Sequence, residues 1–235
     1  MLQRLCRYRS FLDKILLAID RPVNYITLMV NEQTTQQRII DSAFELMYAQ
    51  SYAEVGVAAI CEKADVKKGS FYHFYKSKQE LAIAVLEAKF WEYKESILDT
   101  TFTGKLSPLD EIALFAEKIY QFQADVKAAT GNVLGCPFGN IALELSSQDE
   151  AIRSKIEHIF TRSMDSLRGC LQRGVDNKDA QLSGIDVSAT ADAMYAYLEG
   201  IILFAKAQNN TDVIRQLSPA MLNIRIYPNP NPNPN

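Results

Sequence analysis

Apolar residues recur along most of this 235-residue chain at the three- and four-residue spacing of amphipathic helices. The first helix is predicted to begin at Thr34 or Thr35, because the letters TTQQ at 34–37 have the pattern of a capping box. Three more helices are predicted in this half of the chain: over residues 57–64, over 67–74, and from a second capping box at 77–80 toward Leu98.

The second half of the chain, residues 82–226, keeps the helical spacing and shows no strand signal. The predicted helices cover residues 109–128, 137–145, 151–173 and 187–208, followed by a last stretch from Thr211 that Pro219 disturbs. Pro137 lies in the first turn of the second of these helices, the third is capped from Ser147, and Asp186 caps the fourth. We therefore predict an all-α fold. The repeated Pro-Asn pairs allow neither helix nor strand, so residues 227–235 are predicted to be a disordered tail.

Residues 1–33 do not continue this pattern. Their start is basic and mildly apolar, like a signal peptide, but Asp13, Lys14 and Asp20 interrupt any apolar core and no small-residue cleavage site follows. We interpret the segment as an extension outside the fold, with the biological start at Met29. The alternative is an N-terminal arm that adds phosphate contacts through its arginines, Arg4, Arg7, Arg9 and Arg21.

Residues 63–78 combine two features that seldom occur together. Five lysines fall within these sixteen residues, and five consecutive rings occupy 71–75. A short helix with one face in its own core and the other against a polyanion explains both. Just upstream, apolar residues at 57, 60, 61 and 64 form an amphipathic helix, and Asp65 suits a left-handed turn. The pattern predicts a helix-turn-helix, whose second helix can enter a major groove.

Residues 60–81 resemble the DNA-binding motif of TetR-family transcription regulators, I-A-x-x-A-G-V-x-K-G-x-x-Y-x-(Y/H)-F-x-x-K-x-x-L. The matching positions are Ile60, Cys61, Ala64, Asp65, Val66, Lys68, Gly69, Tyr72, Phe74, Tyr75, Lys78 and Leu81, and the resemblance extends over about 34–93. Three departures are Asp65 and Ser51 in place of glycines, and Gly56 in place of a Ser or Thr cap. They lower stability without removing a DNA contact.

The resemblance implies a helix-turn-helix domain at 34–81, with its motif at about 56–75, and a helical-bundle ligand-binding and dimerisation domain at 82–226. It implies a repressor that binds a double-stranded DNA operator as a homodimer, paired through 151–173 and 187–208, and responds to a small-molecule effector. Two helix-turn-helix domains on a two-fold axis, here called the two reading heads, also bind an operator far more tightly than one such domain. The predicted DNA-binding residues are Thr35, Lys67, Lys68, Gly69, Ser70, Tyr72, His73 and Lys78.

The effector site is predicted less sharply. Candidate ligand-binding residues are Tyr120, Phe138, Phe160 and Tyr197, although aromatic residues at this spacing are more often core. Residues 135–140, GCPFGN, are similar to a G-C-x-x-x-N stretch in a family branch that includes sensors of reactive electrophiles, so Cys136 is a candidate sensor. A helix N-terminus would favour its thiolate. The alternative is an inert thiol, because burial without a cation raises the pKa.

Charge and composition reduce the number of function classes that fit the chain. The chain carries a net charge of −3, while residues 63–78 hold five lysines against Asp65. This focused basic patch on an acidic protein argues against a DNA-binding module without sequence preference. A cysteine-dependent helical enzyme is the other alternative, but there is no Ser-His-Asp arrangement, phosphate-binding glycine loop or metal-ligand cluster. We therefore expect neither catalytic residues nor a metal or cofactor.

Cysteine usage and hydropathy bear on location. The chain has four cysteines without a CxxC pair, which we interpret as reduced thiols of a cytosolic protein. No run reaches eighteen apolar residues, so no membrane span is expected. A bacterial cytoplasmic protein, bound to the nucleoid when it is on DNA, fits these observations.

Overall fold

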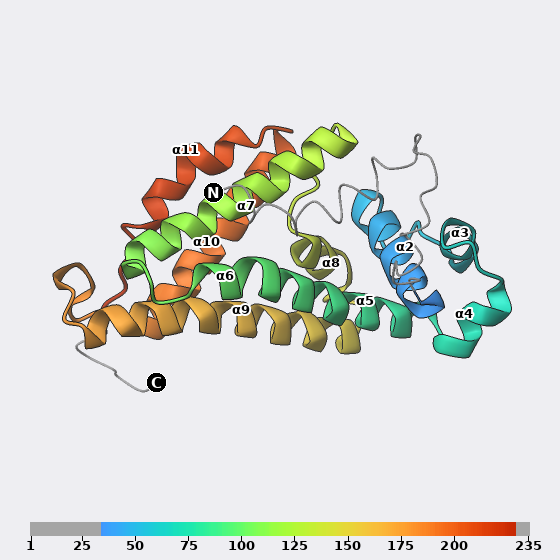
Figure 1. The fold of residues 1–235 in the computed structure, drawn as a ribbon, viewed down its shortest axis with the longest axis horizontal. Coiled ribbons are helices and arrows are strands. Elements are labelled where there is room, and N and C mark those ends of the chain that lie inside the picture. The colour runs from blue at the N-terminus through green and yellow to red at the C-terminus, as the bar shows by residue number, and fades with distance from the viewer. Residues whose placement is uncertain (1–33, 229–235) are drawn as a thin grey trace, which may run out of the picture. The chain divides into compact units, whose positions relative to one another are not determined.

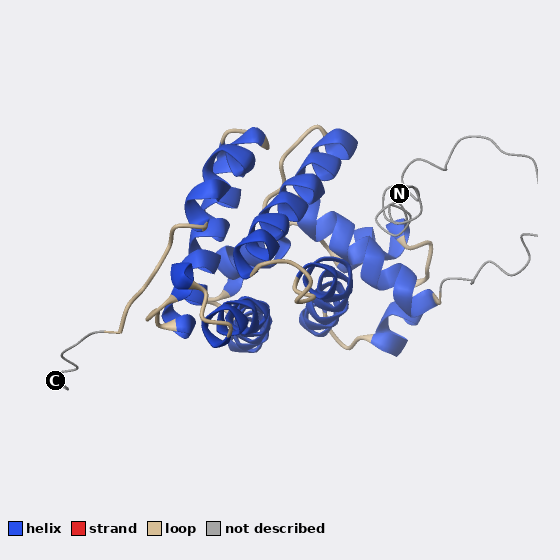
Figure 2. Ribbon diagram, turned by 60° about the vertical axis from the view of Figure 1, so that its left-hand side comes forward, coloured by secondary structure: helices blue, strands red, loops and turns tan. Residues whose placement is uncertain are grey.

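The computed structural model of the chain describes residues 34–228; the predictions for 1–33 and for most of the tail lie outside this range. Every regular element in the described range is helical (Figures 1 and 2), so the all-α prediction is confirmed. The elements are α2 (Thr35–Ala49), α3 (Val57–Lys63), α4 (Lys68–Phe74), α5 (Lys78–Tyr93), η2 (Lys94–Leu98), α6 (Asp99–Thr101), α7 (Pro108–Thr130), α8 (Pro137–Leu145), α9 (Glu150–Asp176), η3 (Ala180–Leu182), α10 (Val187–Ala207) and α11 (Asp212–Met221).

These helices pack as two units. The first comprises the described residues up to Phe90 together with 140–155, and the second comprises 91–139 with 156–228. The helices α5, α8 and α9 each carry residues of both units. The packing therefore extends the first unit beyond residue 81, where the sequence motif ends, and adds the end of α8 and the start of α9 to it. None of the described helices is long and apolar enough to cross a membrane.

The first unit is built around one apolar cluster to which α2, α3, α4 and α5 all contribute. Ile39, Ile60, Phe71 and Leu81, one from each helix, are fully buried. Burial of a side chain of this size contributes about 2 kcal/mol. Helices of seven residues, such as α3 and α4, are not stable alone in water, so this shared cluster is what holds them.

The turn between α3 and α4 contains the predicted left-handed residue. Asp65 has a φ of 51°, and its carbonyl accepts a hydrogen bond from the Arg38 guanidinium of α2 at 3.4 Å. A non-glycine residue in this conformation costs about 1 kcal/mol, which agrees with the stability loss expected for Asp in place of Gly. Ala64 caps α3 and Lys67 caps α4, so each helix is one residue shorter than predicted.

Two other helix ends differ from the prediction for identifiable reasons. The long helix that begins at Lys78 is α-helical only to Tyr93 and then continues through the π-helical segment η2 to Thr101. Helix α9 is capped by Asp149 rather than from Ser147, because its carboxylate accepts the Ile152 N–H at 3.1 Å. The backbone at 146–149 turns back onto the end of α8, which leaves no helix start before Asp149.

In the second unit, α11 lies along α7 and α10 (Figure 1). The apolar contact involves Ile201 and Ala205 of α10 and Ile214 of α11, all nearly or fully buried. Ser107 caps the start of α7, and Gly131, with a φ of 79°, ends it in the left-handed conformation that glycine adopts without strain.

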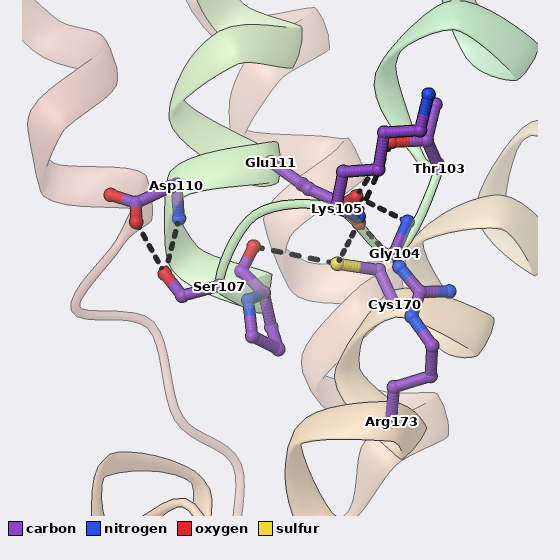
Figure 3. Close-up of polar contacts among 9 residues, drawn as sticks. Thr103, Gly104, Lys105, Ser107, Asp110, Glu111, Cys170 and Arg173 are labelled. Atoms are coloured by element: carbon purple, nitrogen blue, oxygen red, sulfur yellow. Dashed lines mark hydrogen bonds and ion pairs between the residues drawn. The ribbon is translucent and has the colours of Figure 1, made fainter.

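A buried carboxylate fixes the loop before α7 to α9 (Figure 3). Glu111 is fully buried, accepts the Gly104 N–H at 2.6 Å and forms an ion pair with Arg173 of α9. The Cys170 thiol lies 3.5 Å from the same carboxylate, and burial together with this negative charge raises the pKa of Cys170 to about 12. Cys170 is therefore an inert thiol, as a structural cysteine is expected to be.

Candidate DNA-binding surface and effector site

Helix α4 has one face in the core of the first unit and the other in solvent. Phe71 is fully buried, whereas Lys67 at the N-cap, Lys68, Tyr72 and His73 are exposed, Tyr72 with 57% of its surface accessible. Among the described residues no hydrogen bond or ion pair joins these four side chains to the rest of the chain. The two rings among them contact only the ring of an adjacent residue; the Tyr72 and Phe71 ring centroids, for example, are 5.2 Å apart. This face is thus available to an external partner.

The remaining predicted DNA-binding residues surround this face to different degrees. Gly69 is exposed, and a Cβ added there would meet no atom within 4 Å. The packing of the chain itself therefore does not require glycine at 69. Ser70 in α4 and Thr35 in the first turn of α2 are partly accessible.

Lys78 is more engaged than the sequence suggested. Its ammonium group donates to the carbonyls of Tyr52 at 2.9 Å and Val55 at 3.1 Å, and lies 4.2 Å from the centre of the Tyr52 ring. Two of its three N–H donors are thus used within the chain. One donor of Lys78 is thus left over, and the contacts that the structure shows for its ammonium group are with the loop between α2 and α3.

The same loop is held by a carboxylate of α8. Glu144 accepts the backbone N–H of Tyr52 at 3.0 Å and of Ala53 at 2.7 Å. Lys78 and Glu144 therefore satisfy opposite groups of one irregular segment, which has no ladder of its own to do so. Because Gly56 caps α3 without a side-chain hydrogen bond, this clamp supplies order that the cap does not.

The five predicted effector-site residues fall into two groups. Tyr120 and Tyr197 border the apolar contact of α7, α10 and α11, where the Arg215 guanidinium lies 3.7 Å from the centre of the Tyr120 ring and the Tyr197 hydroxyl donates to the Leu217 carbonyl at 3.1 Å. These two tyrosines have structural contacts. The other three, Cys136, Phe138 and Phe160, belong to a different constellation.

That constellation, here called the Glu199 cluster, joins residues from four elements of the second unit. The Phe138 ring meets the Tyr93 ring edge-on at 6.0 Å, and the Phe160 ring meets the Tyr195 ring edge-on at 5.7 Å. Glu199 is hydrogen-bonded to the Cys136 thiol and the Tyr195 hydroxyl. The Glu199 cluster consists of Tyr93, Cys136, Phe138, Phe160, Tyr195 and Glu199.

The surroundings of Cys136 favour its thiol over its thiolate. Its sulfur accepts the Gly139 N–H at 3.3 Å, which is the cap interaction expected at the start of α8. Burial and the nearby Glu199 carboxylate nevertheless raise the pKa of Cys136 well above its ordinary value. Burial also raises the pKa of Glu199 to about 6, although hydrogen bonds from Cys136 and Tyr195 act in the opposite direction.

Sequence reasoning missed Glu199 and Tyr93 as site residues. Glu199 had one detectable signal, because it is the acidic residue within the apolar stretch from Met194 to Phe204, four residues after Tyr195. Residues four apart share a helix face, whereas Tyr197 lies on the opposite side of α10 from Tyr195. Within the described range, no group of three or more His, Cys, Asp or Glu side chains is arranged to hold a metal ion.

Comparison with known proteins shows which family models and which regulators the chain is similar to. Residues 39–85 match the family model described as bacterial regulatory proteins, tetR family, and residues 108–221 match the tetracyclin repressor-like C-terminal domain. The transcriptional regulator AcuR of Cereibacter sphaeroides is 28% identical over 187 residues, covering 77% of this chain and 81% of AcuR. The transcriptional repressor NemR of Escherichia coli K12 is 23% identical over 198 residues, covering 84% and 96%.

Among solved structures, the crystal structure of the regulatory protein TetR from Rhodobacter sphaeroides superposes with a TM-score of 0.69 at 25% identity. The superposition covers 82% of this chain and 99% of that one. Both the helix-turn-helix part and the C-terminal helical part thus have counterparts in a single known architecture.

Proposed function

Because the chain belongs to the tetR family of bacterial transcription regulators, we propose that it is a repressor that reads its operator through α4 and leaves it when an effector binds. The family regulates transcription and is not a family of enzymes. The observation that carries the proposal is the division of α4, with Phe71 fully buried beneath exposed Lys67, Lys68, Tyr72 and His73. The similarity to the repressor NemR supports repression rather than activation.

The exposed residues of α4 have separate tasks in this proposal. Lys67 and Lys68 contact phosphates, which supplies affinity for any DNA and makes binding depend on salt. Tyr72 and His73 contact base edges in the major groove, and Ser70 and Thr35 add hydrogen bonds. Gly69 permits close approach of the backbone, and Lys78 positions the loop before α3 and offers its last N–H to a phosphate.

We further propose that the chain acts as a homodimer, paired through α9 and α10. Leu203 and Phe204 on α10 are 54% and 60% exposed. Gly200, one turn earlier, would meet nothing within 4 Å if it carried a Cβ. Exposed apolar side chains beside a small residue suit a second copy of the same helix, and two reading heads then meet two half-sites of one operator.

The effector is proposed to bind at the Glu199 cluster and to act reversibly, with Cys136 as a wall of the site rather than its reactive group. Helix α8 starts beside Glu199 and ends with Glu144, which holds the loop before α3. A displacement at the start of α8 is thereby passed to the clamp on the helix-turn-helix. Because a regulator of this family works on bacterial DNA, we propose that the protein acts in the cytoplasm.

The test is operator binding by purified chain, with the operator first selected from fragments of the source genome. Lys68→Ala should weaken binding to operator and to random DNA alike, and lower the salt dependence by about one phosphate contact. Tyr72→Ala should weaken operator binding more than binding to random DNA. Lys105→Ala removes an exposed lysine from the second unit and serves as the control.

The same preparations test the dimer. Phe204→Glu should yield a monomer by light scattering, with operator affinity reduced because one head reads one half-site. A Lys67→Ala/Lys68→Ala double variant that binds operator as tightly as wild type would remove α4 as the reading helix. A dimeric Phe204→Glu variant would move the pairing surface away from α10.

A further inference from the structure

Charged side chains buried in this protein usually have a partner of opposite charge. Lys89, in the first unit, pairs with Asp41 at 2.6 Å, and Glu111, in the second, pairs with Arg173. Glu199 is different: within the described part of the chain it forms no ion pair, and its hydrogen bonds come from the neutral Cys136 and Tyr195 groups. The charge on this carboxylate is therefore not neutralised by the chain.

A deep carboxylate without a cation is unfavourable, because water is removed from the charge and neutral donors replace it only in part. Glu199 nevertheless keeps part of its surface accessible, as do Cys136, Tyr93 and Phe160 around it. The residues of a close-packed core, such as Ile112 and Phe115 of the same unit, have almost none. A cation that neutralises Glu199 therefore has to come from outside the described residues, and the accessible part of the residue is where it would bind.

The rest of the Glu199 cluster suits a cation as well. Two edge-on aromatic pairs, Tyr93–Phe138 and Phe160–Tyr195, belong to the cluster, and the Tyr195 hydroxyl of the second pair is hydrogen-bonded to Glu199. Aromatic faces carry negative potential and attract alkylammonium groups within about 6 Å of the ring centre. An anion would instead meet the charge of Glu199, and an uncharged ligand would leave that charge without a partner.

We propose that the Glu199 cluster binds a small organic cation, a protonated amine or quaternary ammonium joined to an apolar group, and that this is the effector. Only the role of the cation as effector rests on the proposed function. The cation-binding site itself is inferred from the residues of the Glu199 cluster. The cation neutralises Glu199, and its apolar part lies against Phe138 and Phe160.

Binding at this point bears directly on α8. A Cβ placed on Gly139 would lie 3.0 Å from a carboxylate oxygen of Glu199, so the first turn of α8 and this carboxylate are already in contact. A ligand that draws Glu199 toward itself changes that contact and the hydrogen bond from Cys136. Such a ligand therefore biases α8, the helix that ends at the Glu144 clamp.

The experiment compares three aromatic probes of nearly equal size but different charge: benzylammonium, benzyl alcohol and benzoate. Their affinities for the purified full chain are measured by isothermal titration calorimetry. We expect benzylammonium to bind about tenfold more tightly than benzyl alcohol, equivalent to about 1.4 kcal/mol, and benzoate to bind most weakly. Equal affinities of the cation and the alcohol, or no binding of any probe, would overturn the proposal.

Two variants locate the effect. Glu199→Gln keeps the size and hydrogen-bonding capacity of the side chain and should abolish the preference for benzylammonium. Glu95→Gln removes an exposed carboxylate from the same unit and should keep it. A preference that survives in Glu199→Gln assigns the cation to another site and refutes the inference. The comparison among probes needs wild type alone, so it holds even if a variant fails to fold.

Operator binding by the same samples separates this inference from the proposed function. Benzylammonium should release operator from wild type and from Glu95→Gln but not from Glu199→Gln, with each release measured against the same sample without a probe. If wild type binds no operator, the proposed function fails while the calorimetric result on the cation stands. If benzylammonium binds through Glu199 but leaves the operator complex intact, the cation is not the effector and that part of the inference is overturned.

Discussion

Two carboxylates of the second unit, Glu111 and Glu199, differ in the partners that the chain provides for their charge. Glu111 is completely enclosed and meets Arg173, the Gly104 N–H and the Cys170 thiol (Figure 3). Glu199 keeps some accessible surface and meets only a thiol and a phenol. The first arrangement is complete without any other molecule, whereas the second lacks a positive charge. Paired charges fix a fold, and a largely buried charge that has hydrogen bonds but no counter-charge is the feature on which we base the proposed ligand site.

The largest effect should come from breaking the complete arrangement. Arg173→Ala leaves Glu111 buried without its cation, which costs about 3 kcal/mol of unfolding free energy. Chemical denaturation at neutral pH measures this loss. The matched change at the other carboxylate, Glu199→Gln, should leave stability unchanged or raise it. If Arg173→Ala costs no more than an exposed Arg→Ala change, the Glu111 pair is not what secures the loop before α7.

The next largest effect should be the contribution of Glu199 to the pH dependence of the unfolding free energy. Burial raises its pKa to about 6 in the folded chain from an ordinary value near 4.5, so the folded state binds this proton more tightly than the unfolded state. The stability that this group contributes is complete below pH 4.5 and is lost as the pH rises through 6. The full difference corresponds to about 2 kcal/mol.

Denaturation curves recorded between pH 4 and pH 8 test this slope. Glu199→Gln should remove the loss seen in wild type over this range, while Glu95→Gln should retain it. Saturating benzylammonium should also flatten the slope, because the cation favours the ionised carboxylate. Identical slopes in wild type and Glu199→Gln would mean that the carboxyl is not desolvated in the folded chain.

The smallest effect concerns packing beside the Glu111 pair. A Cβ on Gly174 would lie 2.3 Å from Leu182 and 3.0 Å from the Pro108 ring, and both neighbours are held in place. Gly174→Ala should therefore destabilise the chain by about 1–2 kcal/mol despite the better helix propensity of alanine. On the same helix, a Cβ on Gly169 would meet nothing within 4 Å. Gly169→Ala should be neutral or slightly stabilising, and thermal unfolding of both variants checks the difference in sign.

The first unit was predictable from sequence in detail because local signals and burial agree there. The spacing that placed Ile60 and Phe71 on apolar faces, and the left-handed Asp65, all recur in the structure. Lys78 was the exception, since a lysine next to a DNA-reading helix gives no local sign that its ammonium bonds Tyr52 and Val55, more than twenty residues away.

The Glu199 cluster, which we propose as the effector site, was predictable only in part, because its members come from distant parts of the chain. Aromatic residues such as Phe138 and Tyr197 look alike in a helical pattern, and only packing separates one that meets Tyr93 from one that joins α11. Burial, and next to it a carboxylate sixty-three positions later, raise the pKa of Cys136, and spacing indicates neither. The helix N-terminus alone suggested the opposite protonation state.

The division of α4 has a consequence for how such a regulator changes its target over evolutionary time. Phe71, which holds the helix in place, is separate from the exposed residues that we propose contact DNA, which are Lys67, Lys68, Tyr72 and His73. Substitutions at the exposed positions are therefore nearly free of selection for stability. A duplicated gene can acquire a new operator through these few codons while its scaffold and effector response are inherited intact.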